Sequence, residues 1–182
     1  MADARRTPAD DRIAAAALHL LRAHGARAVT IEAVAAESGV AKTTIYRRFR
    51  NRHELLAAAL APLTRQQPPA PDSSDRERAT WIVRSAVAAI DDGIGPGGFA
   101  SLLIDEDPEF SALFRRILTA HRGRIVDALF AAGHDIDRGL ADTVIDAVVG
   151  GYISELARAS TVGPGWEERM LRVLTTALPS GV

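Results

Sequence analysis

The chain has 182 residues, of which 47% are hydrophobic and 25% are charged, and it contains no cysteine. This length and composition suit a globular protein of one or two domains, and they exclude a disordered chain and a disulfide-stapled miniature fold. The net charge of -1 hides an asymmetry, because residues 1–60 hold 10 Lys and Arg against 6 Asp and Glu, whereas the remainder holds 12 against 17. No stretch approaches the roughly 18 apolar residues of a spanning helix. We therefore expect a soluble cytoplasmic protein with no membrane partner.

Helix signals recur along the whole chain. Thr7 is a suitable N-cap, Pro8 suits the first helical position and Gly25 suits a C-terminal stop, so the first predicted helix covers about 8–24. Similar caps and three- or four-residue apolar spacing predict further helices over about 31–38, 41–49, 75–92, 98–104, 108–133, 137–160 and 166–178. Another helix is expected to begin just after Asn51, which suits its N-cap. Strand alternation is missing from the pattern, so the predicted fold class is all-α with about nine helices.

A Pro-rich segment interrupts this periodicity. Residues 62–74 contain four prolines and the run Asp72-Ser73-Ser74, which is typical of a linker. The sequence therefore predicts a first helical domain over 1–61, a linker over 62–74 and a second helical domain over 75–182.

The basic segment lies on the third predicted helix and just after it. Two short helices joined at Gly39-Val40, with a longer helix before them, are the layout of a helix-turn-helix. The second short helix of such a motif enters the major groove, where amines read guanine and threonine methyl groups contact thymine. Its basic and hydroxyl side chains are expected to read bases or lie near them: Lys42, Thr43, Thr44 and Arg47. Flanking donors are expected to hold phosphates: Thr30, Tyr46, Arg48 and Arg52.

The order of these residues resembles the DNA-binding domain of the TetR family of bacterial transcriptional regulators. The resemblance covers about residues 10–60 and rests on Thr30-Ile31-Glu32-Ala33-Val34-Ala35, the Gly39-Val40 turn and the run Lys42-Thr43-Thr44-Ile45-Tyr46-Arg47-Arg48-Phe49, followed by Arg52. It implies the same base-reading and phosphate-contacting roles. The family commonly has lysine where this chain has Arg52.

The resemblance also implies a helical domain that senses a small molecule and dimerises through its last two helices. Aromatic and apolar residues of the second domain are candidates to line an effector pocket for a hydrophobic molecule: Trp81, Phe99, Leu103, Phe110, Phe114, Ile117, His121 and Tyr152. Plain core packing is the alternative for most of them. A strip of small residues and an apolar face are candidates for the dimer interface: Ala147, Gly150, Gly151, Ser154, Trp166, Met170, Val173 and Leu174. The alternative is a kink at Gly150-Gly151 with those faces inside one chain.

The expected function is a ligand-responsive repressor that binds a palindromic operator as a homodimer. Activation within the same family, and non-specific architectural DNA binding, are the alternatives. An enzyme is not expected, since the five histidines show no metal-binding spacing and the acids around Asp105 suit the start of a helix better than a metal site. No metal or cofactor is expected.

Overall fold

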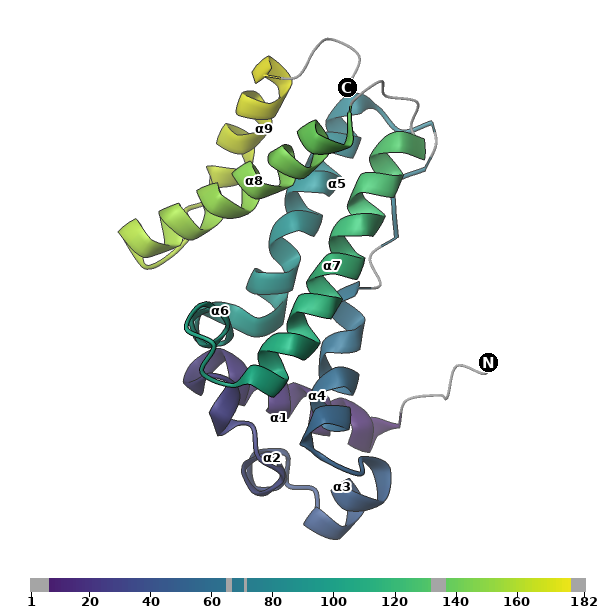
Figure 1. The fold of residues 1–182 in the computed structure, drawn as a ribbon, viewed down its shortest axis with the longest axis vertical. Coiled ribbons are helices and arrows are strands. Elements are labelled where there is room, and N and C mark those ends of the chain that lie inside the picture. Colours follow the sequence, from purple (N-terminus) through teal and green to yellow (C-terminus); the bar gives the residue numbers. More distant parts are fainter. Residues whose placement is uncertain (1–6, 65–66, 71, 132–136, 178–182) are drawn as a thin grey trace. The chain divides into compact units, whose positions relative to one another are not determined.

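The computed structural model describes residues 7–64, 67–70, 72–131 and 137–177. These residues form helices and no strand, so the predicted all-α class is confirmed (Figure 1). The α-helices are α1 (Pro8–His24), α2 (Ile31–Ser38), α3 (Lys42–Arg48), α4 (Arg52–Leu60), α5 (Asp75–Ala88), α6 (Gly95–Leu103), α7 (Pro108–Ala131), α8 (Arg138–Ala159) and α9 (Trp166–Ala177). None of the helices in these ranges is both long and apolar enough to cross a membrane.

Side-chain caps explain why the predicted starts of α1, α4 and α5 are accurate. The Thr7 hydroxyl accepts from the Asp10 amide and the Asp10 carboxylate accepts from the Thr7 amide, which is a complete capping box. Asn51 caps α4 in the same sense, and Ser74 forms a second capping box at α5. The predicted end of the long helix at Gly133 lies outside the described residues.

The passage from α5 to α6 differs from the prediction. Helix α5 ends at Ala88, and a π-helical turn over Ala89–Ile94 leads directly into α6. Gly93 leaves the helical region within this turn, and Gly95 has a φ of +62°. The glycines therefore bend a continuous helical path instead of separating two helices by a loop.

The chain forms two compact units, residues 1–65 with 90–117 and residues 66–89 with 118–182. In the first unit, α1 packs against α2, α4 and α6. Its core includes fully buried side chains from five helices: Ile13, Leu21, Val34, Ile45, Leu55, Leu60, Phe110 and Phe114. Burial of such apolar surface is the main stabilising term of a helical unit. These units cross the boundary predicted at 62–74, because α6 and the start of α7 pack with the N-terminal helices. A functional division of the chain at 62–74 stays a prediction.

In the second unit, α5 packs against α8 and α9. Its core includes Ile82, Val83, Ile125, Val126, Val144, Ile145, Val148 and Leu171. Polar contacts at the edges of this core join neighbouring helices. Arg84 donates two hydrogen bonds to Glu167 of α9, at 2.9 and 3.0 Å, and Arg122 of α7 pairs with Asp142 and Asp146 of α8.

Candidate DNA-binding surface

The turn between α2 and α3 has the geometry of a helix-turn-helix. The Thr30 hydroxyl caps α2 by accepting from the Ala33 amide at 3.1 Å. Helix α2 ends at Gly39, whose φ of +65° is left-handed and therefore suits glycine. Helix α3 starts at Lys42 and has no side-chain N-cap, because Ala41 precedes it. The fully buried Ile45 holds α3 against the core.

The opposite side of α3 faces solvent. Lys42, Thr43, Tyr46 and Arg47 are exposed, Tyr46 to 52%, and Thr44 is half-buried. The Lys42 ammonium lies 3.4 Å from a carboxylate oxygen of Glu32 on α2, and both side chains are exposed. These five residues thus form an accessible polar face on one short helix, which is the arrangement that the major groove requires. We call this set, Lys42, Thr43, Thr44, Tyr46 and Arg47, the α3 face.

Arg48 does not share this exposure. Its guanidinium forms an ion pair with Asp10 of α1, and both side chains are largely covered. Its Nε is buried without a hydrogen-bond partner among the described residues. In this structure Arg48 therefore ties α3 to α1, and the phosphate contact expected from the sequence stays a prediction.

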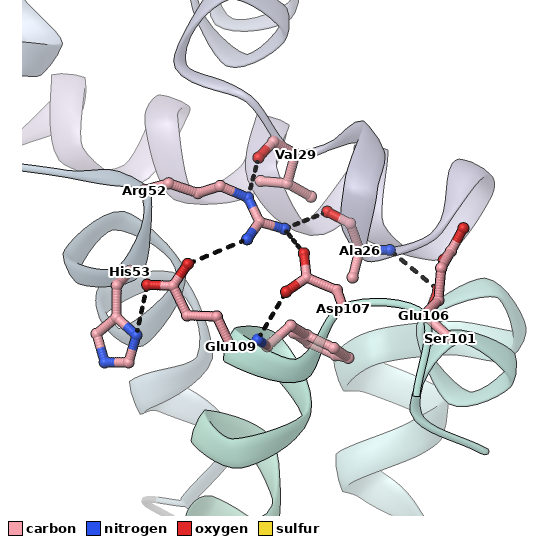
Figure 2. Close-up of polar contacts among 9 residues, drawn as sticks. Ala26, Val29, Arg52, His53, Ser101, Glu106, Asp107 and Glu109 are labelled. Atoms are coloured by element: carbon pink, nitrogen blue, oxygen red, sulfur yellow. Dashed lines mark hydrogen bonds and ion pairs between the residues drawn. The ribbon is translucent and has the colours of Figure 1, made fainter. Parts of the chain in front are cut away.

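Arg52 is also engaged inside the protein. Its Nε donates to the Val29 carbonyl at 2.6 Å, and its Nη2 lies 2.5 Å from the Ala26 carbonyl and 2.7 Å from a carboxylate oxygen of Asp107 (Figure 2). Glu109 lies 3.8 Å from Nη1 and also pairs with His53 at 3.3 Å. The side chain of Arg52 is only 22% exposed. The donors of Arg52 thus have acceptors within the first unit, and the expected phosphate contact stays a prediction.

The two carboxylates that hold these arginines have lowered pKa values. Burial alone would raise the pKa of Asp10, but hydrogen bonds from Thr7 and the pairing with Arg48 outweigh it. Burial acts in the same direction on Asp107, where the Phe110 amide and Arg52 lower the pKa more strongly. Each ionised carboxylate therefore stabilises the fold at pH values above its ordinary pKa of 3.8. That stabilisation is lost as the pH falls through the lowered pKa of the folded state.

The predicted effector-pocket residues are divided between the two units. In the first unit, Phe110 and Phe114 are fully buried and stack with ring centroids 5.7 Å apart. Phe99 and Ile117 are half-buried, whereas Leu103 is 69% exposed and so does not line an interior surface in this structure. A single pocket lined by the whole set stays a prediction.

The other three candidates lie in the second unit. His121 of α7 is buried and its Nε2 lies 2.7 Å from the Ser85 carbonyl of α5. Burial lowers the pKa of His121, and the nearby Arg124 acts in the same direction, so the neutral ring is favoured. Tyr152 meets Trp166 edge to face at 5.4 Å. Trp81 is half-buried, but its Nε1 is buried without a partner among the described residues, and the same is true of the Ser85 hydroxyl.

The predicted dimer residues separate into two groups. Ala147, Gly150 and Ser154 are exposed along α8, and Val173 of α9 is 58% exposed. Trp166 and Leu174 are buried within the second unit, and a Cβ on Gly151 would lie 2.7 Å from the Met170 methyl group. The second group therefore already packs between α8 and α9 of one chain, as the alternative interpretation allowed.

Sequence reasoning missed the partners of Arg48 and Arg52. Asp10 and Asp107 were visible only as acids in the first turn of a helix, which explains them locally. Their second contacts join residues 38 and 55 positions apart, and periodicity does not report such pairs. Among the described residues, no cluster of three or more His, Asp or Glu could hold a metal ion.

A capped α2, a left-handed glycine turn and an exposed polar face on α3 define a helix-turn-helix domain. Residues 13–59 match the family model described as bacterial regulatory proteins, tetR family. The N-terminal part of the chain is thus similar to the DNA-binding domains of this family, as the sequence resemblance implied.

Individual proteins are similar to this chain in part of its sequence or in its fold. Over 60 residues the chain is 38% identical to uncharacterized HTH-type transcriptional regulators of Mycobacterium bovis and Mycobacterium tuberculosis, which covers 33% of this chain and 30% of each relative. The match thus spans less than a third of the length of these curated relatives. The crystal structure of the multidrug binding protein EbrR complexed with ethidium is similar in fold, with a TM-score of 0.50 and 20% identity over 96% of this chain and 100% of that chain.

Proposed function

We propose that the protein is a DNA-binding transcriptional regulator that represses by occupying a palindromic operator as a homodimer. The observation that carries the proposal is the α3 face, exposed beside the capped start of α2 in a domain similar to those of the TetR family. Lys42 and Thr43 lie at the start of α3, where a recognition helix contacts base edges. Thr30 and the first amides of α2 supply neutral donors for a phosphate.

A dimer is proposed because a single α3 can contact only one half-site. Two recognition helices about 34 Å apart read two half-sites one helical turn apart, which one helix of seven residues cannot do. The exposed small residues Ala147, Gly150 and Ser154 would let α8 approach its copy closely. Val173 on α9 adds exposed apolar surface to the same pair of helices.

A small hydrophobic or amphipathic effector is the proposed signal. Support comes from two buried polar groups on one face of α5, the Trp81 Nε1 and the Ser85 hydroxyl, four residues apart. An effector switches the protein only if it binds one conformation more tightly than the other. Release of the operator by such a molecule would make the protein a ligand-responsive repressor.

Selection from random duplexes tests the DNA-binding proposal. The full chain is incubated with a library of random double-stranded DNA, and the bound fraction is amplified and sequenced over several rounds. We expect a two-fold symmetric motif with half-site centres about 10 base pairs apart. Enrichment of no motif, with binding to all sequences alike, would contradict the proposal and indicate an architectural DNA-binding protein.

Lys42→Ala refines the same experiment. If Lys42 reads a base directly, its loss relaxes the preference at one position of each half-site and costs about 1–3 kcal/mol of discrimination there. The motif recovered with this variant is compared position by position with that of the wild type. An unchanged motif would show that Lys42 does not read a base.

A further inference from the structure

Arg52 joins three segments that are remote in sequence. It starts α4, donates to two carbonyls of the segment that leads into α2, and pairs with Asp107 at the start of α7 (Figure 2). A planar guanidinium with five donors can bridge such acceptors, whereas an ammonium group acts as one point charge. Breaking one contact would leave an acceptor of this covered site with one donor fewer.

The backbone of Ala26 is hydrogen-bonded through both its amide and its carbonyl group. Its carbonyl accepts from Arg52, and its amide donates to the Ser101 hydroxyl of α6 at 3.1 Å. Ser101 in turn donates to Glu106 at 2.7 Å. Ala26 is fully buried, and the preceding Gly25, with a φ of +80°, leaves no room for a Cβ because one would lie 2.6 Å from the Ser101 oxygen. The entry into α2 is therefore fixed four residues before the capping Thr30.

Asp107 performs two structural tasks. One carboxylate oxygen accepts from the Phe110 amide at 3.0 Å and so caps α7, while the other lies 2.7 Å from Arg52. The start of α7 is thereby attached to the start of α4 and, through Arg52, to the entry into α2. All of these residues belong to the first compact unit.

We infer that Arg52 is a positioning residue for operator recognition, and that Asp107, which lies outside the helix-turn-helix, controls operator affinity through it. Arg52 sets the place of Thr30 and α2 relative to α3, and Asp107 holds the guanidinium in the orientation that does so. This inference rests on the proposed function, since it concerns the affinity for an operator.

The direction in which one substitution changes the affinity for DNA distinguishes the positioning role of Arg52 from a phosphate contact. If DNA phosphate were the working partner of Arg52, Asp107→Asn would free the guanidinium and remove a negative charge, so binding would become tighter. If Arg52 positions α2, the same substitution loosens its orientation and binding becomes weaker. Asparagine can still cap α7, so the helix start is retained.

The experiment measures operator and scrambled-duplex affinities of wild type, Asp107→Asn and Asp105→Asn by fluorescence anisotropy, using the operator obtained by selection. Asp105 is the matched control, because it carries the same charge two residues away, is 52% exposed and contacts Arg115 instead of Arg52. Its φ of +50° is one that asparagine tolerates. We expect Asp107→Asn to bind the operator about tenfold more weakly than Asp105→Asn, with no loss of affinity for the scrambled duplex. Equal or tighter operator binding by Asp107→Asn would overturn the inference.

Arg52→Lys is the second variant and decides the question if Asp107→Asn fails to fold. A lysine keeps the charge and can contact a phosphate, so a phosphate role predicts near wild-type affinity. The positioning role predicts about tenfold weaker operator binding, together with faster amide hydrogen exchange at Ala26 and in the first turn of α2. Wild-type affinity of Arg52→Lys would overturn the inference. Lack of operator preference in the wild type itself would instead overturn the proposed function and this inference with it.

Discussion

Arg47 and Arg48 show how the surroundings of a residue decide its role. Arg47 is exposed on the α3 face, whereas the next residue pairs with Asp10 of α1. Counting positive charges in the segment therefore overestimates the number available to DNA. The salt dependence of binding should reflect the exposed cations, because the slope reports the phosphates that are neutralised.

Arg48→Ala tests this distinction. We expect it to lower the stability of the fold by about 1 kcal/mol, as the loss of a partly covered ion pair does, and to leave the salt slope of DNA binding nearly unchanged. Urea unfolding gives the stability, and operator affinity at several salt concentrations gives the slope. A slope reduced by about 0.9 with unchanged stability would show that Arg48 contacts a phosphate after all.

His121 predicts a pH dependence of stability. Burial and Arg124 lower its pKa in the folded chain, so the unfolded chain binds a proton more readily. The free energy of unfolding is therefore expected to fall as the pH drops below 6.5, the ordinary pKa of histidine, toward the lowered pKa of His121 in the folded chain. Thermal unfolding at pH 7.5 and 5.5 should show a smaller loss for His121→Gln, which does not titrate, than for the wild type. Equal losses would contradict the buried neutral ring.

At the scale of elements, the contact between α1 and α6 depends on glycine. A Cβ on Gly97 would lie 2.5 Å from the Arg22 carbonyl oxygen and 3.1 Å from that of Leu21. The backbones of the two helices thus approach closely, and Arg22 adds a hydrogen bond from its Nε to the Gly93 carbonyl at 2.7 Å. A methyl group added at Gly97 would therefore meet backbone atoms, which cannot rotate away as side chains do.

Gly97→Ala is therefore expected to destabilise the fold by about 1–3 kcal/mol, since the added methyl group forces the two helices apart. Gly123→Ala on α7 is the matched control, because a Cβ there meets no described atom within 4 Å. That control should be neutral or stabilise by up to about 1 kcal/mol through helix propensity. Chemical unfolding of both variants measures the difference, and equal stabilities would contradict the close contact of α1 and α6.

The starts of α1, α4 and α5 could be predicted because their determinants are local. Thr7, Asn51 and Ser74 each cap a helix from within three residues, so the sequence alone contains the signal. The role of Arg52 could not be predicted in this way, because Asp107 comes near it only after α6 and α7 have packed on the N-terminal helices. The exposed α3 face was predictable from its pattern, whereas the loss of Arg48 from that face depended on the tertiary position of Asp10.

At the scale of the whole molecule, the proposed dimer requires α8 to pack closely against its copy. Gly150 is exposed, and a Cβ on it would meet no described atom within 4 Å, so one chain has no evident need of glycine there. Close packing of α8 against its copy would explain the small residue.

Gly150→Leu tests this explanation. The larger side chain fits on the exposed face of a single chain but would separate two closely packed helices. We therefore expect the variant to be a monomer whose helices unfold at nearly the same temperature as those of the wild type. Sedimentation velocity of both proteins at equal concentration measures the change. A wild-type monomer, or a variant that remains a dimer, would contradict an interface centred on Gly150.

The measurement that tests the central claim most directly is the affinity of the wild-type protein for the selected operator and for a scrambled duplex of equal length, at near-physiological salt. Sedimentation of the complex gives its stoichiometry in the same buffer. A specific regulator predicts a preference of about 10³ or more for the operator, with two protomers on each duplex. Equal and weak binding to both duplexes would contradict the claim that the α3 face reads a sequence.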